Sequence, residues 1–197
     1  MMKHLLSFFA FSLLLSMAGA ASASTWTFDD PHTNIRFRTK HLMVVDVWGK
    51  FNTFSGTITY DPKDITKSKV DVTIDVASVD TDNEKRDNHL RSADFFDAEN
   101  YPKMTFVSKK IEKAGAGKLK IIGDLTIRGV TREVTLDVDG PTGPFGFMKM
   151  NKMAAHATTV INRMDYGVNW NMPLAKGGLL VSEDVDIVID AELNEMK

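Results

Sequence analysis

The chain has 197 residues, of which 43% are hydrophobic and 25% are charged, and its formal net charge is −2. Such a weakly acidic balance gives no electrostatic attraction for nucleic acid, so no nucleic-acid partner is expected. The chain contains no Cys, which excludes a disulfide-stabilised scaffold and a cysteine nucleophile. The length favours one domain of ordinary size.

The N-terminal segment, residues 1–23, is typical of a cleaved secretory signal peptide. A positively charged start precedes an apolar run from Leu5 to Met17, and the run is followed by the cleavage sequence Ala21-Ser22-Ala23. We expect cleavage before Ser24, with cleavage after Ala20 or Ala21 as the alternative. The apolar run is shorter than the roughly 20 residues that span a bilayer, so it does not predict a membrane anchor.

Residues 24–197 form the expected mature protein, a single domain. An exported protein without disulfides fits the bacterial periplasm best, and secretion to the medium stays open. No later segment is apolar enough to cross a membrane, so an integral membrane protein is not expected.

Most of the mature chain alternates apolar and polar residues. This alternation predicts strands with one buried and one solvated face, as in antiparallel sheet. The clearest examples are VDVTIDV at 70–76 and VSEDVDIVIDAEL at 181–193. The predicted strands are Trp26–Phe28, Ile35–Met43, Gly49–Tyr60, Lys69–Val79, Lys103–Ile111, Lys118–Ile127, Val130–Asp139, Lys152–Ile161 and Leu180–Leu193.

Two segments interrupt the alternation. The polar segment at 83–93 has its charged residues spaced for a short helix, with Asn83 or the preceding Asp as the cap. We expect the apolar residues that follow, Phe95 and Phe96, to pack against one end of the sheet. The sequence GPTGPFGFMKM at 140–150 predicts a Gly/Pro-rich loop that carries four large apolar side chains, which is unusual for a simple surface loop.

An open sheet of about eight antiparallel strands would leave two edge strands with unpaired backbone groups. A sandwich or closure into a barrel avoids such edges, and the long strands favour closure. The predicted fold class is therefore all-β, a closed or nearly closed antiparallel β-barrel with a short helical insertion near residues 83–93. The interior of an eight-stranded barrel is either filled by its own side chains or holds one small ligand.

Residues 123–138, GDLTIRGVTREVTLDV, predict a hairpin that turns at Arg128-Gly129. With a two-residue turn the numbers of facing residues sum to 257, and the apolar side chains share one face. On the other face Asp124 then opposes Glu133, which is unfavourable. A longer loop stays open, because Arg-Gly suits a type I′ turn less well than Asn-Gly.

Two residues on the apolar face of this hairpin do not suit a tightly filled core. Gly123 lies in the middle of a strand, which marks a bulge, a bend or the close approach of another group. Arg132 lies near the end of the apolar row, where its guanidinium could reach solvent or contact the polar head of a ligand.

Together with three other segments, the hairpin resembles the YceI-like family of bacterial periplasmic proteins. The other matching segments are HLRSADFFDAENYPKMTFVS at 89–108, SxWTFDxxHTNIRFRTKHLM at 24–43 and INRMDYGV at 161–168. The resemblance implies an elongated, lipocalin-like barrel whose apolar interior accommodates a polyisoprenoid or a similar amphiphile. It also implies residence in the periplasm and, in many members, an association with stress responses.

We predict that apolar residues at inward and loop positions line this cavity, although each could equally serve plain core packing. They are Phe37, Met43, Trp48, Phe51, Val72, Ile74, Phe106, Leu125, Ile127, Phe145, Phe147 and Met153. Arg132 is the candidate contact for a polar head group.

The sequence shows no arrangement typical of catalysis. It lacks a GxSxG elbow, and its four mature His residues lie far apart without the spacing of a metal site. Arg163 and Asp165 predict a buried ion pair rather than a catalytic pair. We therefore predict a non-enzymatic periplasmic carrier of an isoprenoid-type lipid that uses no metal or cofactor.

Two alternatives stay open for the function. One is a hydrolase or isomerase that acts on an amphiphile in the same cavity, and the other is a filled barrel that serves as an interaction or stress protein without a ligand. The sequence also leaves open whether the protein forms a homodimer.

Overall fold

The computed structural model of the protein describes residues 23–175 and 177–196, so the predicted signal peptide lies outside the described residues except for its last position. The strands are β1 (Ser24–Phe28), β2 (Asn34–His41), β3 (Val45–Phe51), β4 (Phe54–Tyr60), β5 (Lys69–Asp75), β6 (Val79–Asp80), β7 (Lys103–Lys113), β8 (Lys118–Ile127), β9 (Val130–Phe147), β10 (Met150–Asn162) and β11 (Val181–Glu195). The helices are α1 (Glu84–Arg91) and the short 3₁₀ helices η1 (Asp30–His32), η2 (Ile65–Lys67), η3 (Val76–Ser78) and η4 (Arg163–Tyr166).

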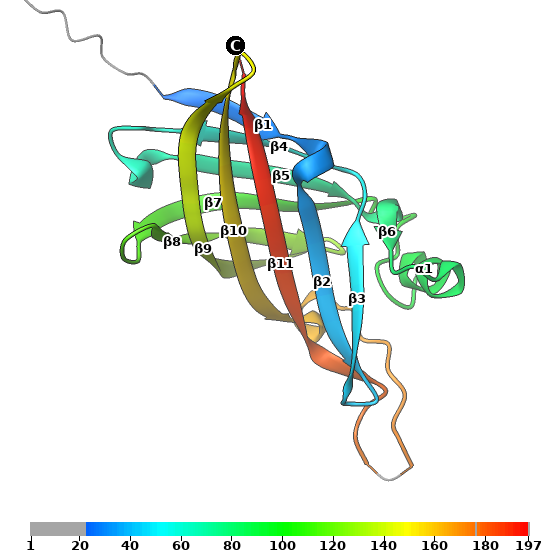
Figure 1. Ribbon diagram of the computed structural model, residues 1–197. Helices are drawn as coiled ribbons and strands as arrows, with labels where there is room; N and C mark the ends of the chain where they lie inside the picture. Colours follow the sequence, from blue (N-terminus) through cyan, green and yellow to red (C-terminus); the bar gives the residue numbers. More distant parts are fainter. Residues whose placement is uncertain (1–22, 176, 197) are drawn as a thin grey trace, which may run out of the picture.

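Eight of the strands close into an antiparallel barrel (Figure 1). Neighbouring strands follow the order β1, β4, β5, β7, β8, β9, β10 and β11, and the C-terminal end of β11 pairs back with β1. The rest of β11 pairs with β2, from which β3 and β6 continue the sheet. The predicted fold class, an all-β, lipocalin-like antiparallel barrel, is confirmed.

Three strands of the barrel are bent, and each bend divides one strand into two. β1 continues as β2 after η1, β3 continues as β4 after residues 52–53, and β5 continues as β6 after η3. The predictions of single strands over Gly49–Tyr60 and Lys69–Val79 are therefore wrong. The bends at residues 52–53 and at η3 are joined by a hydrogen bond, in which the backbone N–H of Thr53 donates to Ser78 Oγ at 3.0 Å.

The β8–β9 hairpin has the predicted register. Facing residues sum to 257 from Ile127 opposite Val130 to Lys118 opposite Asp139. The turn residues Arg128 and Gly129 have φ angles of 50° and 73°, as the two central positions of a type I′ turn require. The tight turn is therefore confirmed.

The unfavourable pair on the outer face of this hairpin is neutralised by a neighbouring strand. Lys109 Nζ lies 3.3 Å from Asp124 Oδ1 and 2.7 Å from Glu133 Oε2. Lys109 is left out of the β7–β8 pairing by a shift of register between Ser108 and Lys110. The bulge thus places one cation between two carboxylates that would otherwise repel each other.

Gly123, on the inner face, accommodates the close approach of an aromatic ring. A Cβ atom at this position would lie 2.6 Å from Phe106 Cζ and 2.6 Å from the carbonyl oxygen of Val107. The ring of Phe106 occupies the space that a side chain would need. Of the explanations that the sequence offers for this glycine, close approach is the one that the structure confirms.

Residues 140–150 form a projecting hairpin, so the prediction of a loop is wrong. β9 pairs with β8 only as far as Asp139, but its pairing with β10 continues to Phe147 opposite Met150. The hairpin lies at the top of Figure 1, beside the C-terminal end of β11. Its prolines are tolerated because this part of β9 has no neighbour on one side and its register with β10 is irregular.

The predicted helix is confirmed as α1, which lies outside the barrel beside β6 (Figure 1). Asn83 caps it, since its Oδ1 accepts a hydrogen bond from the N–H of Arg86 at 3.0 Å. Phe95 and Phe96, which follow the helix, pack into the core of the barrel. In the part of the chain that the structure describes, no helix has the length and apolarity of a membrane span.

Candidate functional site

The barrel encloses an apolar cavity of about 280 Å³. Its walls are the inward side chains of the strands, with Leu90, Phe95 and Phe96 at the side covered by α1. The cavity follows β10 from Met153 to Ile161, roughly 26 Å along the strand at the usual rise per residue. The described lining residues include no Asp, Glu, His or Lys. This space suits an elongated apolar molecule.

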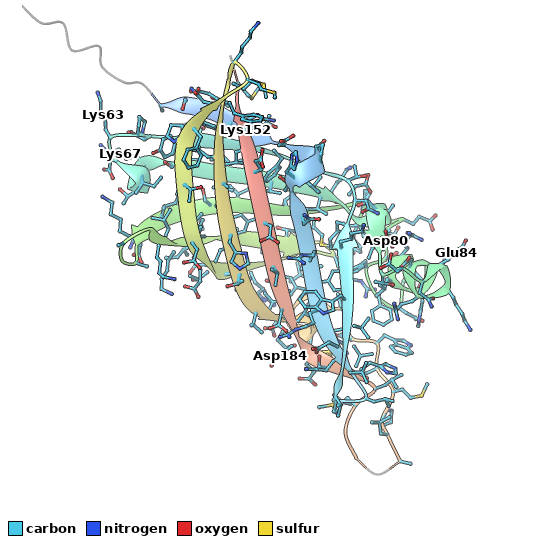
Figure 2. The ribbon with its side chains drawn as sticks, in the orientation of Figure 1. Lys63, Lys67, Asp80, Glu84, Lys152 and Asp184 are labelled. Carbon is cyan, nitrogen blue, oxygen red and sulfur yellow. The ribbon has the colours of Figure 1, made fainter. Side chains whose placement is uncertain are left out.

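The outside of the barrel has the opposite character. Side chains such as Lys63, Lys67 and Glu84 point away from the barrel in Figure 2. On the strands themselves, exposed ion pairs such as Lys118–Asp139 lie on the outer face. The strands thus separate a charged exterior from an apolar interior, as their alternating sequences predict.

Eight of the twelve predicted lining residues face the cavity. They are Phe37, Phe51, Val72, Ile74, Phe106, Leu125, Ile127 and Met153. Their place in the wall follows from the alternation of their strands. Contact with a ligand stays a prediction for each of them.

Met43 and Trp48 lie outside the cavity. Met43 is in the turn between β2 and β3 and is 52% exposed. Trp48 is three residues from the inward Phe51 in the same strand, and an odd spacing turns it to the outer face. There its ring stacks against the guanidinium groups of Arg36 and Arg38, at 5.8 and 5.6 Å from the ring centroid.

Phe145 and Phe147 also lie outside the cavity, on the projecting β9–β10 hairpin. They are 58% and 54% exposed, because this hairpin extends past the end of β8 and none of the described strands covers its free side. Their aromatic character and their position in a Gly/Pro-rich segment predict a contact with the interior, but the hairpin carries them away from it.

Arg132, the predicted contact for a polar head, is exposed at the start of β9. It shares its parity with the inward Val134, yet its side chain does not line the cavity, and its Nη1 donates to the carbonyl oxygen of Thr131 at 3.3 Å. The guanidinium reaches solvent, which is the other alternative that the sequence leaves open.

Sequence reasoning missed a complete wall of the cavity, the inner row of β11. This row consists of Val185, Ile187, Ile189, Ala191 and Leu193. The alternation of the strand predicts that these residues face inward. It does not distinguish a residue that fills a core from one that borders a space.

One end of the cavity, the polar end, is lined by two buried polar residues of η4, Arg163 and Tyr166, which are only 6% and 2% exposed. Arg163 Nε donates to the carbonyl oxygen of Ser182 at 2.9 Å, and Nη1 donates to that of Val168. Arg163 Nη2 and Tyr166 Oη have no hydrogen-bond partner among the described residues. Asp165 is exposed, and among these residues Arg163 binds carbonyl groups in place of the expected ion pair.

The protonation states at this end follow from burial. Burial raises the pKa of Tyr166 to about 12, with a smaller upward effect of Asp165 and a downward effect of Arg132. Burial also lowers the pKa of Arg163, but a guanidinium starts so high that it stays charged at neutral pH. The polar end therefore presents one positive charge and one neutral hydroxyl group.

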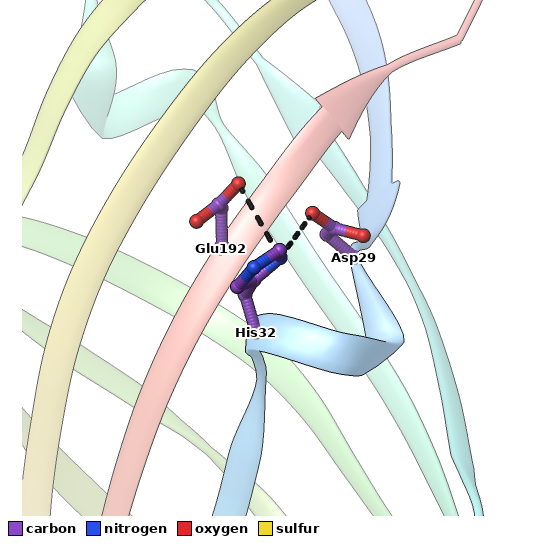
Figure 3. Close-up of side chains that lie close together, drawn as sticks. All are labelled: Asp29, His32 and Glu192. Atoms are coloured by element: carbon purple, nitrogen blue, oxygen red, sulfur yellow. Dashed lines mark hydrogen bonds and ion pairs between the residues drawn. The ribbon is translucent and has the colours of Figure 1, made fainter.

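A second group of polar side chains, Asp29, His32 and Glu192, lies on the outside of the barrel near the end of β1 (Figure 3). His32 Nδ1 is 2.9 Å from Asp29 Oδ2 and 3.9 Å from Glu192 Oε1. These three residue types could bind a metal ion, but Lys152 Nζ already lies 2.6 Å from Asp29 and 2.5 Å from Glu192. The ammonium group of Lys152 occupies the position that a metal ion would take between the two carboxylates. We therefore interpret these side chains as an ion-pair network that joins β1, β10 and β11.

Comparison with known proteins adds independent information about the chain. A profile of the YceI-like domain matches residues 26–193. A UPF0312 protein of Staphylococcus aureus (strain MSSA476) is 38% identical over an alignment 177 residues long, which covers 87% of this chain and 98% of the relative.

Two solved structures share the barrel. The YCEI protein of Campylobacter jejuni is 38% identical, with a TM-score of 0.70, and the match covers 80% of this chain and 90% of that chain. A protein described as a polyisoprenoid binding domain from Saccharophagus degradans, implicated in plant cell wall breakdown, has a TM-score of 0.64 over 87% of this chain and 98% of that chain. It is only 16% identical, so that likeness shows a common fold and no more.

Proposed function

The chain belongs to the YceI-like family, and from that premise we propose that it is a periplasmic binding protein that carries an amphiphilic lipid with an isoprenoid-type chain. The observation that carries the proposal is the apolar cavity along the barrel axis, whose described lining includes no Asp, Glu, His or Lys. A protein with the same fold is described as a polyisoprenoid binding domain, and this description motivates the class of ligand that we propose. The signal-like N-terminal sequence and the lack of Cys support the periplasm.

The apolar wall is sufficient to bind such a chain. Each CH₂ group that is removed from water contributes about 0.8 kcal/mol. Ten such groups give about 8 kcal/mol before the costs of ordering, which corresponds to a micromolar dissociation constant. Affinity therefore comes from the length of the buried chain, and selectivity requires a contact with the polar head.

Binding fits this cavity better than turnover does. Proton transfer in enzymes near neutral pH relies mostly on His, Asp, Glu or Lys. The described lining contains none of these residues, and its polar end offers a guanidinium and a hydroxyl with a raised pKa. We therefore propose a carrier and keep catalysis as an outcome of the experiment below.

Extraction of the purified protein tests the proposal. The full chain is expressed with its N-terminal segment, recovered from the periplasmic fraction and extracted with organic solvent, and the extract is analysed by mass spectrometry. We expect recovery in that fraction and a prenyl lipid near one molecule per protein. An empty extract from a protein that also fails to take up added prenyl lipid would contradict the proposal. A lipid that changes chemically on incubation would favour the enzyme.

A pair of variants on β10 shows whether the cavity holds the lipid. Ala157 lines the cavity and is 9% exposed, so Ala157→Phe should fill part of the space and reduce the lipid content several-fold. Thr158, the next residue, points to the opposite face, and Thr158→Phe should leave the lipid content unchanged. Equal lipid content in both variants would locate the lipid outside the barrel.

A further inference from the structure

The polar end of the cavity has no role in holding an apolar chain. Arg163 and Tyr166 are both more than nine-tenths buried, and each has one polar atom without a partner among the described residues. Buried polar groups in proteins are nearly always hydrogen bonded, and an unpaired one costs about 1–3 kcal/mol, more when it is charged. The two atoms, Nη2 and Oη, belong to residues that line the cavity, and no described residue supplies either atom with a partner.

The backbone fixes both side chains before any ligand binds. Asn162 Oδ1 accepts the N–H of Met164 at 2.9 Å at the start of η4, and Gly167 ends η4 with a φ of 73°. Arg128 Nη1, from the β8–β9 turn, donates to the carbonyl oxygen of Gly167 at 2.8 Å. The other two guanidinium nitrogens of Arg163 are held by carbonyl oxygens. Donors that are already oriented lose little conformational entropy on binding.

The charge at this end defines the chemistry of the missing partner. Among the described residues Arg163 bonds to neutral carbonyl groups. The carboxylate of Glu183 is near enough for its charge to act on Arg163, but among these residues it neither forms an ion pair with Arg163 nor lines the cavity. A buried guanidinium without a directly bonded carboxylate favours an anionic partner, and its planar geometry suits the oxygens of a phosphate or a carboxylate. Tyr166 keeps its proton at neutral pH because burial raises its pKa to about 12, so its hydroxyl can donate a second hydrogen bond.

We propose that Arg163 Nη2 and Tyr166 Oη bind the head group of the lipid, and that this head group is an oxyanion, either a phosphate or a carboxylate. The inference rests on the proposed lipid-binding function and adds the orientation of the lipid and the chemistry of its head. The apolar chain runs from η4 along β10 toward Met153. Arg132 lies near the same end, since its charge acts on Tyr166, but its exposed side chain stands outside the cavity.

Three ligands with one chain and different heads test this assignment: farnesyl phosphate, farnesoic acid and farnesol. Their dissociation constants are measured with delipidated protein by displacement of the apolar fluorophore 1-aminoanthracene. We expect the wild-type protein to bind at least one of the two anions about tenfold more tightly than farnesol, because a charged acceptor makes the stronger hydrogen bonds. The comparison of the two anions identifies the oxyanion that fits.

Tyr166→Phe is the central variant, because it removes one oxygen atom that has no partner among the described residues. The variant should fold with an unchanged or higher melting temperature, bind the preferred anion about tenfold less tightly and bind farnesol as the wild type does. Tyr101, which is 38% exposed and does not line the cavity, provides the matched control. Tyr101→Phe should leave all three affinities unchanged, and Arg163→Met should abolish the preference for the anion.

Two results separate this inference from the proposed function. Equal wild-type affinities for the three ligands, or a Tyr166→Phe variant that keeps the full preference, would overturn the head-group site while lipid binding stands. If none of the three ligands displaces the fluorophore, the proposed function is overturned together with the head-group site.

Discussion

The two faces of the β8–β9 hairpin share a backbone and differ in the interactions that they make. On the inner face Gly123 and Leu125 pack against Phe106 at the wall of the cavity. On the outer face Lys120 Nζ lies 2.6 Å from Asp137 Oδ1, and both side chains are about half exposed or more. Burial of apolar surface is not subject to electrostatic screening, whereas water and salt screen an exposed ion pair. The inner face should therefore determine stability and cavity shape, and the outer face should contribute little to either.

The largest effect is expected at Phe106, which is 7% exposed. Phe106→Ala removes most of a buried ring from the wall, and we expect the free energy of unfolding to fall by about 4 kcal/mol in urea titrations. Its neighbour Val107 points outward and is 45% exposed, so Val107→Ala should cost less than about 1 kcal/mol. Similar costs for the two substitutions would contradict the distinction between the faces.

A smaller loss is expected at Gly123, where an added methyl group would collide with Phe106 and with the backbone of Val107. Gly123→Ala should lower the free energy of unfolding by about 2 kcal/mol. The cost should shrink in a Phe106→Ala background, since one of the two collisions is then gone. Gly146→Ala is the control, because its methyl group would meet only Asn151 at 4.0 Å. A cost that stays the same in both backgrounds would show that Phe106 is not the obstacle.

The ion-pair network around Lys152 should have an effect on stability between those of the two faces. It lies outside the barrel, but the Lys152 and Asp29 side chains are only 17% and 16% exposed. Hydrogen bonds from Lys152 and then His32 lower the pKa of Asp29 from 3.8 to about 2. Because the folded-state pKa is the lower one, this contribution to stability is present above about pH 4 and is lost as the pH falls through about 2. We expect the wild-type melting temperature to fall over that interval and that of Asp29→Asn to fall less. Parallel curves would assign the acid sensitivity to other groups.

The smallest effect on stability is expected on the outer face of the β8–β9 hairpin. Lys120→Ala removes an ion pair between exposed groups, and we expect the melting temperature to change by less than about 3 °C. The difference from wild type should decrease further in 1 M salt, where the Debye length is roughly 3 Å. A large change that is insensitive to salt would show that the outer face contributes through packing, and it would weaken the comparison.

The sequence predicts the regular half of the barrel well. In β8 and β9 the local signals are the alternation, the turn at Arg128-Gly129 and the mid-strand glycine at 123. The first two fix the register of the hairpin, and the glycine marks a close contact. Trp48 shows the limit of such reasoning in a single position. It is as apolar as Phe51, but only residues an even number of positions apart share a face, so the two cannot line the same wall.

The bent half of the barrel was harder to predict, although the sequence carries a signal for it. Phe51 faces inward before the break at 52–53, whereas Ile58 and Tyr60 face inward after it, so the inward parity changes from odd to even. The same change, in reverse, separates Ile74 from Val79 across η3. A parity change within one apolar run therefore marks a bend. The sequence carries no comparable signal for the polar end of the cavity. Arg163 and Tyr166 line the cavity only because η4 packs against the end of the barrel, and this packing cannot be read from the local sequence.

β11 pairs with β1 near the two ends of the described chain, with Trp26 opposite Glu195. Contacts between residues so distant in sequence slow folding. Without β11 the barrel lacks one wall. If the proposed function holds, a lipid is loaded only after the fold is complete, and it stabilises only the finished barrel. A C-terminally truncated chain that lacks β11 should then bind no lipid.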